Sequence, residues 1–220
     1  FSATFLGGIG GTNVSFLGGV GQTRALSSLL TVGNATVAGN VRTTGSQTFG
    51  SNLNVTGASD FLAGGSWSVL GATSLAQSAT VNASTVFFSG AVTSSAGRDL
   101  SVSSPGLITF ASDVGLGGAL RNLTVNGGGL TRITGTLNLT GAGQGQFFNA
   151  TELLSDVLLT GGSFTFAQAL DSGAAGPFSL VATGPGTMGF ATDVGAGRAL
   201  RSIDTSAAFL TQVGGNVFTT

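Results

Sequence analysis

The chain of 220 residues contains no cysteine, no histidine and no tyrosine, and all seven of its basic residues are arginine. Without cysteine it has neither a disulfide framework nor thiolate chemistry. Without histidine or lysine, and with a single glutamate, it offers few agents for general acid–base catalysis. Only 7% of the residues are charged and the net charge is −1, so no electrostatic field favours nucleic acid. No run of about 18 apolar residues is present, which argues against membrane insertion. We therefore expect no enzyme and no cofactor.

Small residues and phenylalanine take the place of the missing types. The chain has 39 glycines and 16 phenylalanines, and 41% of its residues are hydrophobic. Disordered chains of low charge lack this apolar content, because they cannot bury enough surface to offset the entropy of ordering. The composition therefore predicts a folded chain built largely from small residues.

Three segments of the sequence superpose without gaps, and they define large internal repeats. They read VSFLGGVGQTRALSSL, ITFASDVGLGGALRNL and MGFATDVGAGRALRSI. The offsets between them are 94 and 80 residues. We interpret the chain as one domain, 1–220, with imperfect repeats at 14–107 and 108–187 and a partial one at 188–220. The equivalent apolar positions are predicted to form an internal core stack: Phe16, Phe110 and Phe190, and Leu26, Leu120 and Leu200.

Smaller units lie within each large repeat. Residues 107–186 divide into four pieces of 23, 18, 16 and 23 residues, each ending in Gly- or Ser-rich sequence. The pieces contain alternating runs such as Leu123-Thr-Val125 and Phe164-Thr-Phe166, a period that predicts strands. Units that can be gained or lost singly are typical of stacked coils. The sequence thus predicts an all-β parallel solenoid of about eleven coils of roughly 20 residues, with coils about 4.8 Å apart. A β-sandwich is the alternative, and it would not predict ungapped repeats.

The order of these motifs resembles the filamentous-haemagglutinin class of repeats. Its elements are an apolar-Thr-Phe start, a Gly-rich turn, an Ala-Leu-x-x-Leu strand and Gly-Gly or Thr-Gly punctuation. Such repeats occur in large bacterial surface proteins, adhesins and autotransporter passengers. The resemblance implies a right-handed parallel β-helix that is exported and displayed outside the cell. No catalytic residue carries over from it.

Two matched acid–cation pairs are the strongest candidates for chemistry. Asp113 and Asp193 occupy the same Asp-Val-Gly context, and Arg121 and Arg201 follow eight residues later. β-Helical enzymes that act on polysaccharides use clustered carboxylates, often with a cation. The simpler interpretation is a turn aspartate that bonds its own backbone, beside a solvated arginine. We favour the turn interpretation, because Asp113 and Asp193 lie in repeats several coils apart and cannot form one site. Trp67 alone would be a poor carbohydrate platform.

Seven Asn-x-Ser/Thr sequons are more than the roughly three that chance gives at this composition. They are either glycosylation sites or a by-product of a strand pattern that alternates outward polar with inward apolar residues. We favour the second interpretation. The sequons begin at Asn13, Asn34, Asn54, Asn82, Asn122, Asn138 and Asn149.

The two ends of the sequence, written one after the other, resemble an internal segment of the chain. Written end to end, the last and first residues read NVFTTFSATF, and the internal segment Asn40–Phe49 reads NVRTTGSQTF. Seven of the ten positions agree. Solenoids normally end in a cap, and neither end here resembles one. Two arrangements explain this match: a cut from a longer tandem array, or separate copies of the chain that stack head to tail so that one completes the coil of the other. We favour the second, in which the ends mediate self-assembly through Phe1, Phe5, Val217, Phe218 and Thr220.

The leading functional prediction is a structural component of an extracellular bacterial fibre or stalk that stacks head to tail. The alternatives are an adhesin or autotransporter passenger that binds a surface glycan or host ligand, and a β-helical carbohydrate-active enzyme.

Overall fold

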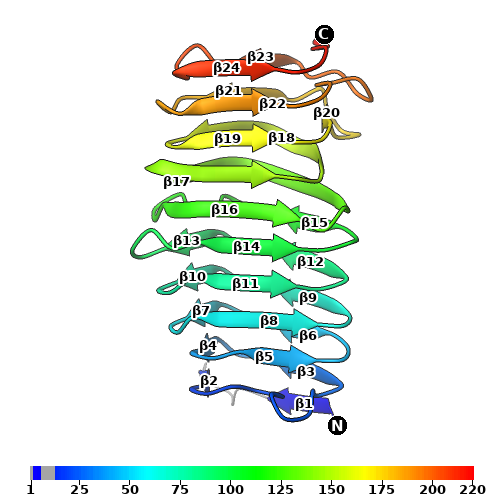
Figure 1. Cartoon of the computed structure of the whole chain (residues 1–220). Helices are drawn as coiled ribbons and strands as arrows, with labels where there is room; N and C mark the ends of the chain where they lie inside the picture. Colours follow the sequence, from blue (N-terminus) through cyan, green and yellow to red (C-terminus); the bar gives the residue numbers. More distant parts are fainter. Residues whose placement is uncertain (1, 6–12) are drawn as a thin grey trace.

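The computed structural model describes residues 2–5 and 13–220, and in this part the chain forms a parallel β-solenoid of about ten coils without helices. Figure 1 shows the coils stacked as a rod with the N-terminal end at the bottom and the C-terminal end at the top. The nearer strands run from left to right while the chain climbs, so the solenoid is right-handed (Figure 1). The predicted fold class is confirmed.

Each complete coil contributes strands to three faces, which the chain visits in the order face 1, face 2, face 3. Face 1 contains β2 (Val14–Phe16), β4 (Ala35–Val37), β7 (Leu53–Val55), β10 (Thr73–Leu75), β13 (Val92–Ser94), β21 (Ser179–Ala182) and β23 (Ser202–Asp204). Face 2 contains β5 (Val41–Thr43), β8 (Ser59–Ala63), β11 (Ala79–Asn82), β14 (Leu100–Ser103), β16 (Leu120–Asn126), β19 (Ser163–Phe166), β22 (Thr187–Phe190) and β24 (Leu210–Val213). Face 3 contains β1 (Ser2–Phe5), β3 (Ser28–Thr31), β6 (Gln47–Phe49), β9 (Ser66–Val69), β12 (Thr85–Phe88), β15 (Ile108–Phe110) and β20 (Leu170–Ser172).

Two longer strands run around corners of the rod. β17 (Leu130–Phe147) passes from face 3 through face 1 to face 2, and β18 (Ala150–Thr160) passes from face 3 to face 1. A single strand thus extends over nearly the whole segment from Asn149 to Thr160.

Side chains of one strand alternate between the interior and the solvent, as strand geometry requires. Because the coils pair in parallel and in register, equivalent positions stack into columns along the rod. On face 3, Val69 pairs with Phe88 and Phe88 with Phe110. The rings of Phe88 and Phe110 are stacked with their centroids 5.0 Å apart. Trp67 is buried in the same core, with its ring centroid 4.9 Å from that of Phe88.

Glycines at the corners allow successive coils to approach. At Gly161, φ is +92°, and a Cβ atom would lie 1.8 Å from the carbonyl oxygen of Leu139 in the coil below. A Cβ on Gly129 would lie 1.7 Å from the carbonyl oxygen of Gly106. The Gly-rich punctuation in the sequence therefore marks places where backbone packs on backbone and no side chain fits.

The predicted core residues are mostly buried, but they do not form one stack. Phe16 lies on face 1, Phe110 on face 3 and Phe190 on face 2, and all three are buried. Leu120 and Leu200 are also buried, whereas Leu26 is only half-buried.

The cause is that the large repeats do not span whole numbers of coils. From β2, four coils lead to β13 on the same face, and β15 lies two faces further on. From β15, three coils lead to β20, and β22 again lies two faces further on. Each repeat is thus displaced by two-thirds of a coil. One sequence pattern can therefore form any of the three faces.

Replacing Phe110 with alanine is expected to lower the free energy of unfolding by about 3–5 kcal/mol, because a buried ring leaves a cavity. Phe87, on the neighbouring β12, points outward and is 38% exposed, so Phe87→Ala is the matched control and is expected to cost much less. Urea unfolding followed by circular dichroism measures both. A loss below about 1 kcal/mol at Phe110 would contradict its buried position.

Candidate functional site

The last coil ends the described rod with an open strand edge. It consists of β23, β24 and the segment around Val217, which bridges to Val194 on face 3. The N–H groups of Phe218 and Thr220 donate to carbonyl oxygens of the coil below, at 2.9 and 3.0 Å. Because backbone groups along a strand point alternately to its two sides, the N–H groups of Val217 and Thr219 point beyond the last coil. This edge can accept another parallel strand.

Apolar side chains gather on the same coil. Val217 and Phe218 are 46% and 45% exposed, and Thr220 is also exposed. Leu170 and Val194, which stand below Val217 in the same inward column, are almost fully buried, whereas Phe218 occupies an outward position. Three further residues of the last coil are exposed: Phe209, Leu210 and Val213. The last coil thus presents both unpaired backbone and apolar surface.

The opposite end begins with β1, whose backbone pairs with β3 so that Phe5 lies opposite Thr31. Phe1, the other residue predicted to act in assembly at this end, lies outside the described residues. β2 forms the first described strand of face 1, and Val20 bridges to Val41 on face 2. These segments form the N-terminal edge of the rod.

A ladder of polar side chains joins the coils at their corners. Asp113 accepts a hydrogen bond from the N–H of Thr136 at 2.7 Å, and Asp193 accepts one from the N–H of Asn216 at 2.7 Å. Asn40 accepts one from the N–H of Asp60 in the same way. These residues come directly before the first inward residue of a strand and bond the equivalent residue of the next coil. The expectation that Asp113 and Asp193 bond their own turn is therefore corrected, since their partners lie one coil away.

The acid–cation pairs that were considered as a candidate site, and not favoured, do not form. Arg121 pairs with Asp99, with Nε 2.8 Å from Oδ1. Arg201 pairs with Asp156 at 3.3 Å. Asp113 and Asp193 remain at separate corners, and each is engaged with backbone. Arg121 thus links successive coils along the outer surface, whereas Arg201 reaches Asp156 two coils below.

Asp99 is a carboxylate of this surface whose pKa is shifted by its neighbours. The hydrogen bond from the Arg121 guanidinium lowers the pKa of Asp99 below its usual value, and the Asn122 amide, which donates to Oδ1 at 2.8 Å, lowers it further. Burial opposes this effect. The ionised form of Asp99 is therefore the form that the fold stabilises.

Several sequon asparagines serve the same inter-coil ladder. Asn122 accepts from the N–H of Gln144 and donates to Asp99. Asn149 is buried and donates to the carbonyl oxygen of Asn126 at 3.3 Å. At these sites the amide nitrogen, which would carry a glycan, is bonded to a neighbouring coil. Asn13, Asn54 and Asn82 are exposed.

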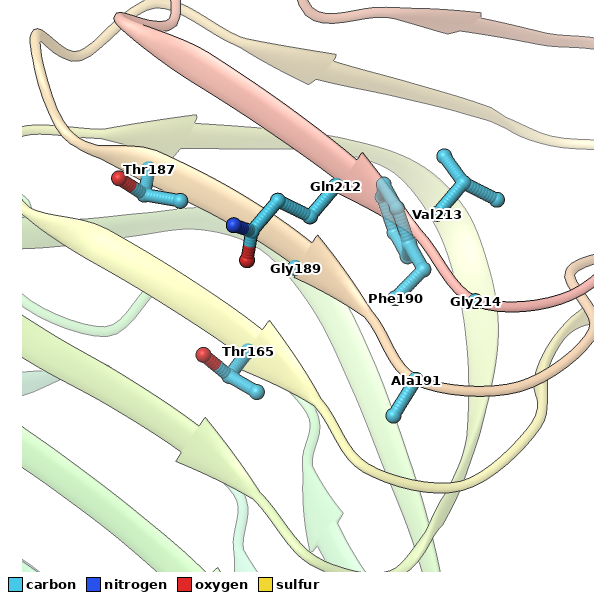
Figure 2. Close-up of a pocket in the computed structure, with 8 residues that line it drawn as sticks. All are labelled: Thr165, Thr187, Gly189, Phe190, Ala191, Gln212, Val213 and Gly214. Atoms are coloured by element: carbon cyan, nitrogen blue, oxygen red, sulfur yellow. The ribbon is translucent and has the colours of Figure 1, made fainter.

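A shallow hollow of about 330 Å³ lies on face 2 near the C-terminal end. Figure 2 shows that Gly189 leaves a gap in the outward column between Thr165 and Gln212, with Thr187 beside it. A Cβ atom on Gly189 would lie 3.5 Å from the Thr165 hydroxyl, so packing does not require glycine there. The lining supplies hydroxyl and amide groups and no ionisable side chain: Thr165, Thr187, Gly189, Phe190, Ala191, Gln212, Val213 and Gly214.

Within residues 2–5 and 13–220, no group of three acidic, histidine or cysteine side chains is placed to hold a metal ion. The same part of the chain contains no helix long and apolar enough to cross a membrane. No family model, no curated protein and no solved structure matches this chain.

Replacing Asp113 tests the role of the corner ladder. Asp113→Ala removes the acceptor for the Thr136 N–H and is expected to cost about 1.5–3 kcal/mol of unfolding free energy, the range for a hydrogen bond to a charged group. Asp113→Asn keeps an oxygen in place and is expected to cost less.

Asp113→Asn and Asp193→Asn should also leave any measured activity unchanged. Polysaccharide cleavage that either change abolishes would contradict a structural role.

The pKa of Asp99 predicts a pH dependence of stability. Because the pKa is lowered in the fold, its contribution is present above the unfolded value near 3.8 and is lost as pH falls through the folded value. The difference in urea midpoint between the native chain and Asp99→Asn should therefore become smaller as the pH is lowered. Arg121→Gln removes the same interaction and should show the same narrowing. A gap that stays constant down to the lowest pH at which the chain folds would contradict this assignment.

Proposed function

We propose that this chain is a structural segment of an extracellular bacterial fibre or stalk, and that copies of it stack head to tail through their end coils. The observation that carries the proposal is the open edge of the last coil, where unpaired backbone and exposed apolar side chains coincide. A second parallel strand would satisfy both, by backbone pairing and by burial of apolar surface.

The form of the rod supports a mechanical role. About ten coils at the parallel strand spacing give a rod on the order of 50 Å long. Backbone hydrogen bonds run along the rod axis between neighbouring coils, and the corner ladder adds side-chain bonds in the same direction. A load along the axis is therefore shared among many parallel bonds.

The location outside a bacterial cell is part of the proposal and rests on the resemblance to filamentous-haemagglutinin repeats. Two features are compatible with it: the solenoid fold itself and the scarcity of charge. An array of this kind would serve as a stalk, a spacer or the shaft of a fibre.

One observation favours the adhesin alternative as a second candidate. The hollow beside Gly189 presents the Gln212 amide and the Thr165 and Thr187 side chains on one side (Figure 2). Hydroxyl and amide groups of this kind can hydrogen-bond sugar hydroxyls. Its shallow form and lack of a charged group make it the weaker of the two candidates.

Sedimentation of the purified chain at increasing concentration, with negative-stain imaging, tests the stacking. We expect axial polymers that grow with concentration. Thr219→Pro removes an N–H that points beyond the last coil and should block growth, since proline cannot donate to a strand ladder. Thr219→Ala keeps this N–H and is the matched control, which should still polymerise. A native chain that stays monomeric at high concentration would overturn the proposal.

A further inference from the structure

The middle column of outward side chains on face 2 has one gap, at Gly189. Parallel pairing places equivalent outward residues of successive coils directly above one another. From β11 to β24 this column consists of Thr80, Ser101, Thr124, Gln146, Thr165, Gly189 and Gln212. Every member except Gly189 carries a hydroxyl or an amide group. The hollow of about 330 Å³ lies at this gap (Figure 2).

Neither the backbone nor the packing of the rod requires a glycine at this gap. Gly189 lies inside β22, and its φ is not in the left-handed region. The nearest atom to an added Cβ would be the Thr165 hydroxyl oxygen at 3.5 Å, which is an ordinary contact, whereas a Cβ on Gly129 would overlap the backbone of the coil below. A glycine inside a strand weakens it, and such a glycine often marks a place where a ligand approaches closely. The gap at Gly189 therefore points to a ligand.

A second outward column, beside the gap, combines an exposed aromatic ring with small residues. Through β17, β19, β22 and β24 it consists of Phe148, Ala167, Ala191 and Gly214. The Phe148 side chain is 47% exposed, whereas the preceding residue, Phe147, is buried in the core. Phe148 lies two coils below the level of Gly189, which is about 10 Å at the parallel strand spacing. Only the alanine side chains project from this column between Phe148 and the hollow.

The outward side chains around the gap carry no charge. The third column, on the other side of Gly189, consists of Gln144, Ser163, Thr187 and Leu210. Across the four coils from β17 to β24, the three columns therefore present hydroxyl, amide, aromatic and aliphatic groups. A phosphate, sulfate or carboxylate group of a ligand would find no cation here to pair with. The surface thus favours a neutral polar ligand.

We propose that this part of face 2 binds a neutral oligosaccharide, with one sugar ring in the hollow at Gly189 and another ring of the same glycan on Phe148. A pyranose ring carries hydroxyl groups at its rim and C–H groups on its faces. The hydroxyls of Thr165 and Thr187 and the amide of Gln212 can donate to and accept from the rim. The negative face of the Phe148 ring attracts the C–H groups.

The size of the hollow agrees with a single sugar ring. Ligand pockets commonly measure about 300–1,000 Å³, and the hollow lies at the lower end of that range. Its open form leaves room for the rest of a glycan to continue across Ala191 and Ala167 toward Phe148. Trp67, the aromatic residue considered from the sequence, has no part in this surface because it is buried in the core.

This inference rests on the second candidate function, the adhesin, and does not depend on head-to-tail stacking. The hollow opens sideways from the rod, and its walls come from β19, β22 and β24. A strand paired above β24 would extend the surface and leave the hollow open. Glycan binding and stacking can therefore be measured separately on the same chain.

An array of immobilised neutral oligosaccharides, each paired with its sialylated or sulfated form, tests the proposal with the purified chain. We expect binding to neutral oligosaccharides, with no gain from the acidic group. Calorimetry with the neutral oligosaccharide that binds most tightly then gives the affinity in solution. This affinity should be the same at low and high salt, because no ion pair contributes to it.

Two variants locate the glycan on face 2. Gly189→Thr fills the gap with the side chain that the coil below carries, and is expected to weaken binding by about tenfold or more. Phe148→Ala removes the exposed ring and is expected to weaken binding roughly threefold to tenfold. The matched controls are Ser101→Thr, in the same column as Gly189, and Phe87→Ala, an exposed phenylalanine on face 3. Both controls should bind like the native chain, and circular dichroism should show all four variants folded.

The outcomes separate this inference from the proposed fibre. A native chain that binds no neutral oligosaccharide, or only the sialylated or sulfated forms, would overturn the inference. Binding that either Gly189→Thr or Phe148→Ala leaves unchanged would place the glycan elsewhere and would overturn it as well. Sedimentation of the same chains reports stacking independently, so fibres that bind no glycan would leave the fibre proposal intact. Glycan binding by a chain that stays monomeric would support the inference and overturn the stacking.

Discussion

Backbone hydrogen bonds between successive coils impose the main constraint on this molecule. Each coil must place its three strands in register about 4.8 Å above the strands of the coil below, because a slip of one residue would turn every inward side chain outward. At each corner the backbone must follow the same course as in the coil below, and it passes so close to that coil that there is little space for side chains. Glycine meets this demand where the carbonyl of one coil occupies the place of a Cβ in the next, as at Gly129 and Gly161. The abundance of glycine and other small residues is a consequence of this close approach.

The corner ladder extends the same constraint to side chains. Asp113, Asp193 and Asn40 each precede a strand and bond the backbone of the following coil, so these polar residues fix the spacing without entering the core. The position accepts aspartate, asparagine or serine, since each provides an oxygen at the right distance. At Asn34 and Asn122 the corner asparagine is followed by an inward apolar residue and a more exposed threonine, so at these two sites the strand pattern itself produces an Asn-x-Thr triplet.

The three faces of the solenoid are approximately equivalent, so the structure repeats approximately every third of a coil. The repeated motif around Phe16, Phe110 and Phe190 moves by two-thirds of a coil from copy to copy. Every face needs the same alternation of inward and outward residues and the same kind of corner. A sequence that fits one face therefore also fits the other two.

Much of the fold could be predicted from the sequence. The repeats and the alternating runs such as Phe164-Thr-Phe166 predicted parallel coils, because period-two patterns in short Gly-bounded units have few other solutions. The face on which each repeat lies could not be predicted, since the sequence does not show where the corners divide a coil. The partners of Asp113 and Arg121 could not be predicted for a related reason. They lie one coil away, at a distance along the chain that varies with every loop.

Hydrogen exchange measured residue by residue tests most directly the claim that each coil is held by backbone bonds to both of its neighbours. In the dispersed chain, amides of the central strands β4 to β22 should exchange slowly on both inward and outward residues, because alternate N–H groups bond the coils above and below. In β24 and the segment around Val217, every second amide should exchange fast, and assembly should protect these amides as well. A central region in which every second amide exchanges fast, as in an unpaired edge strand, would contradict the account.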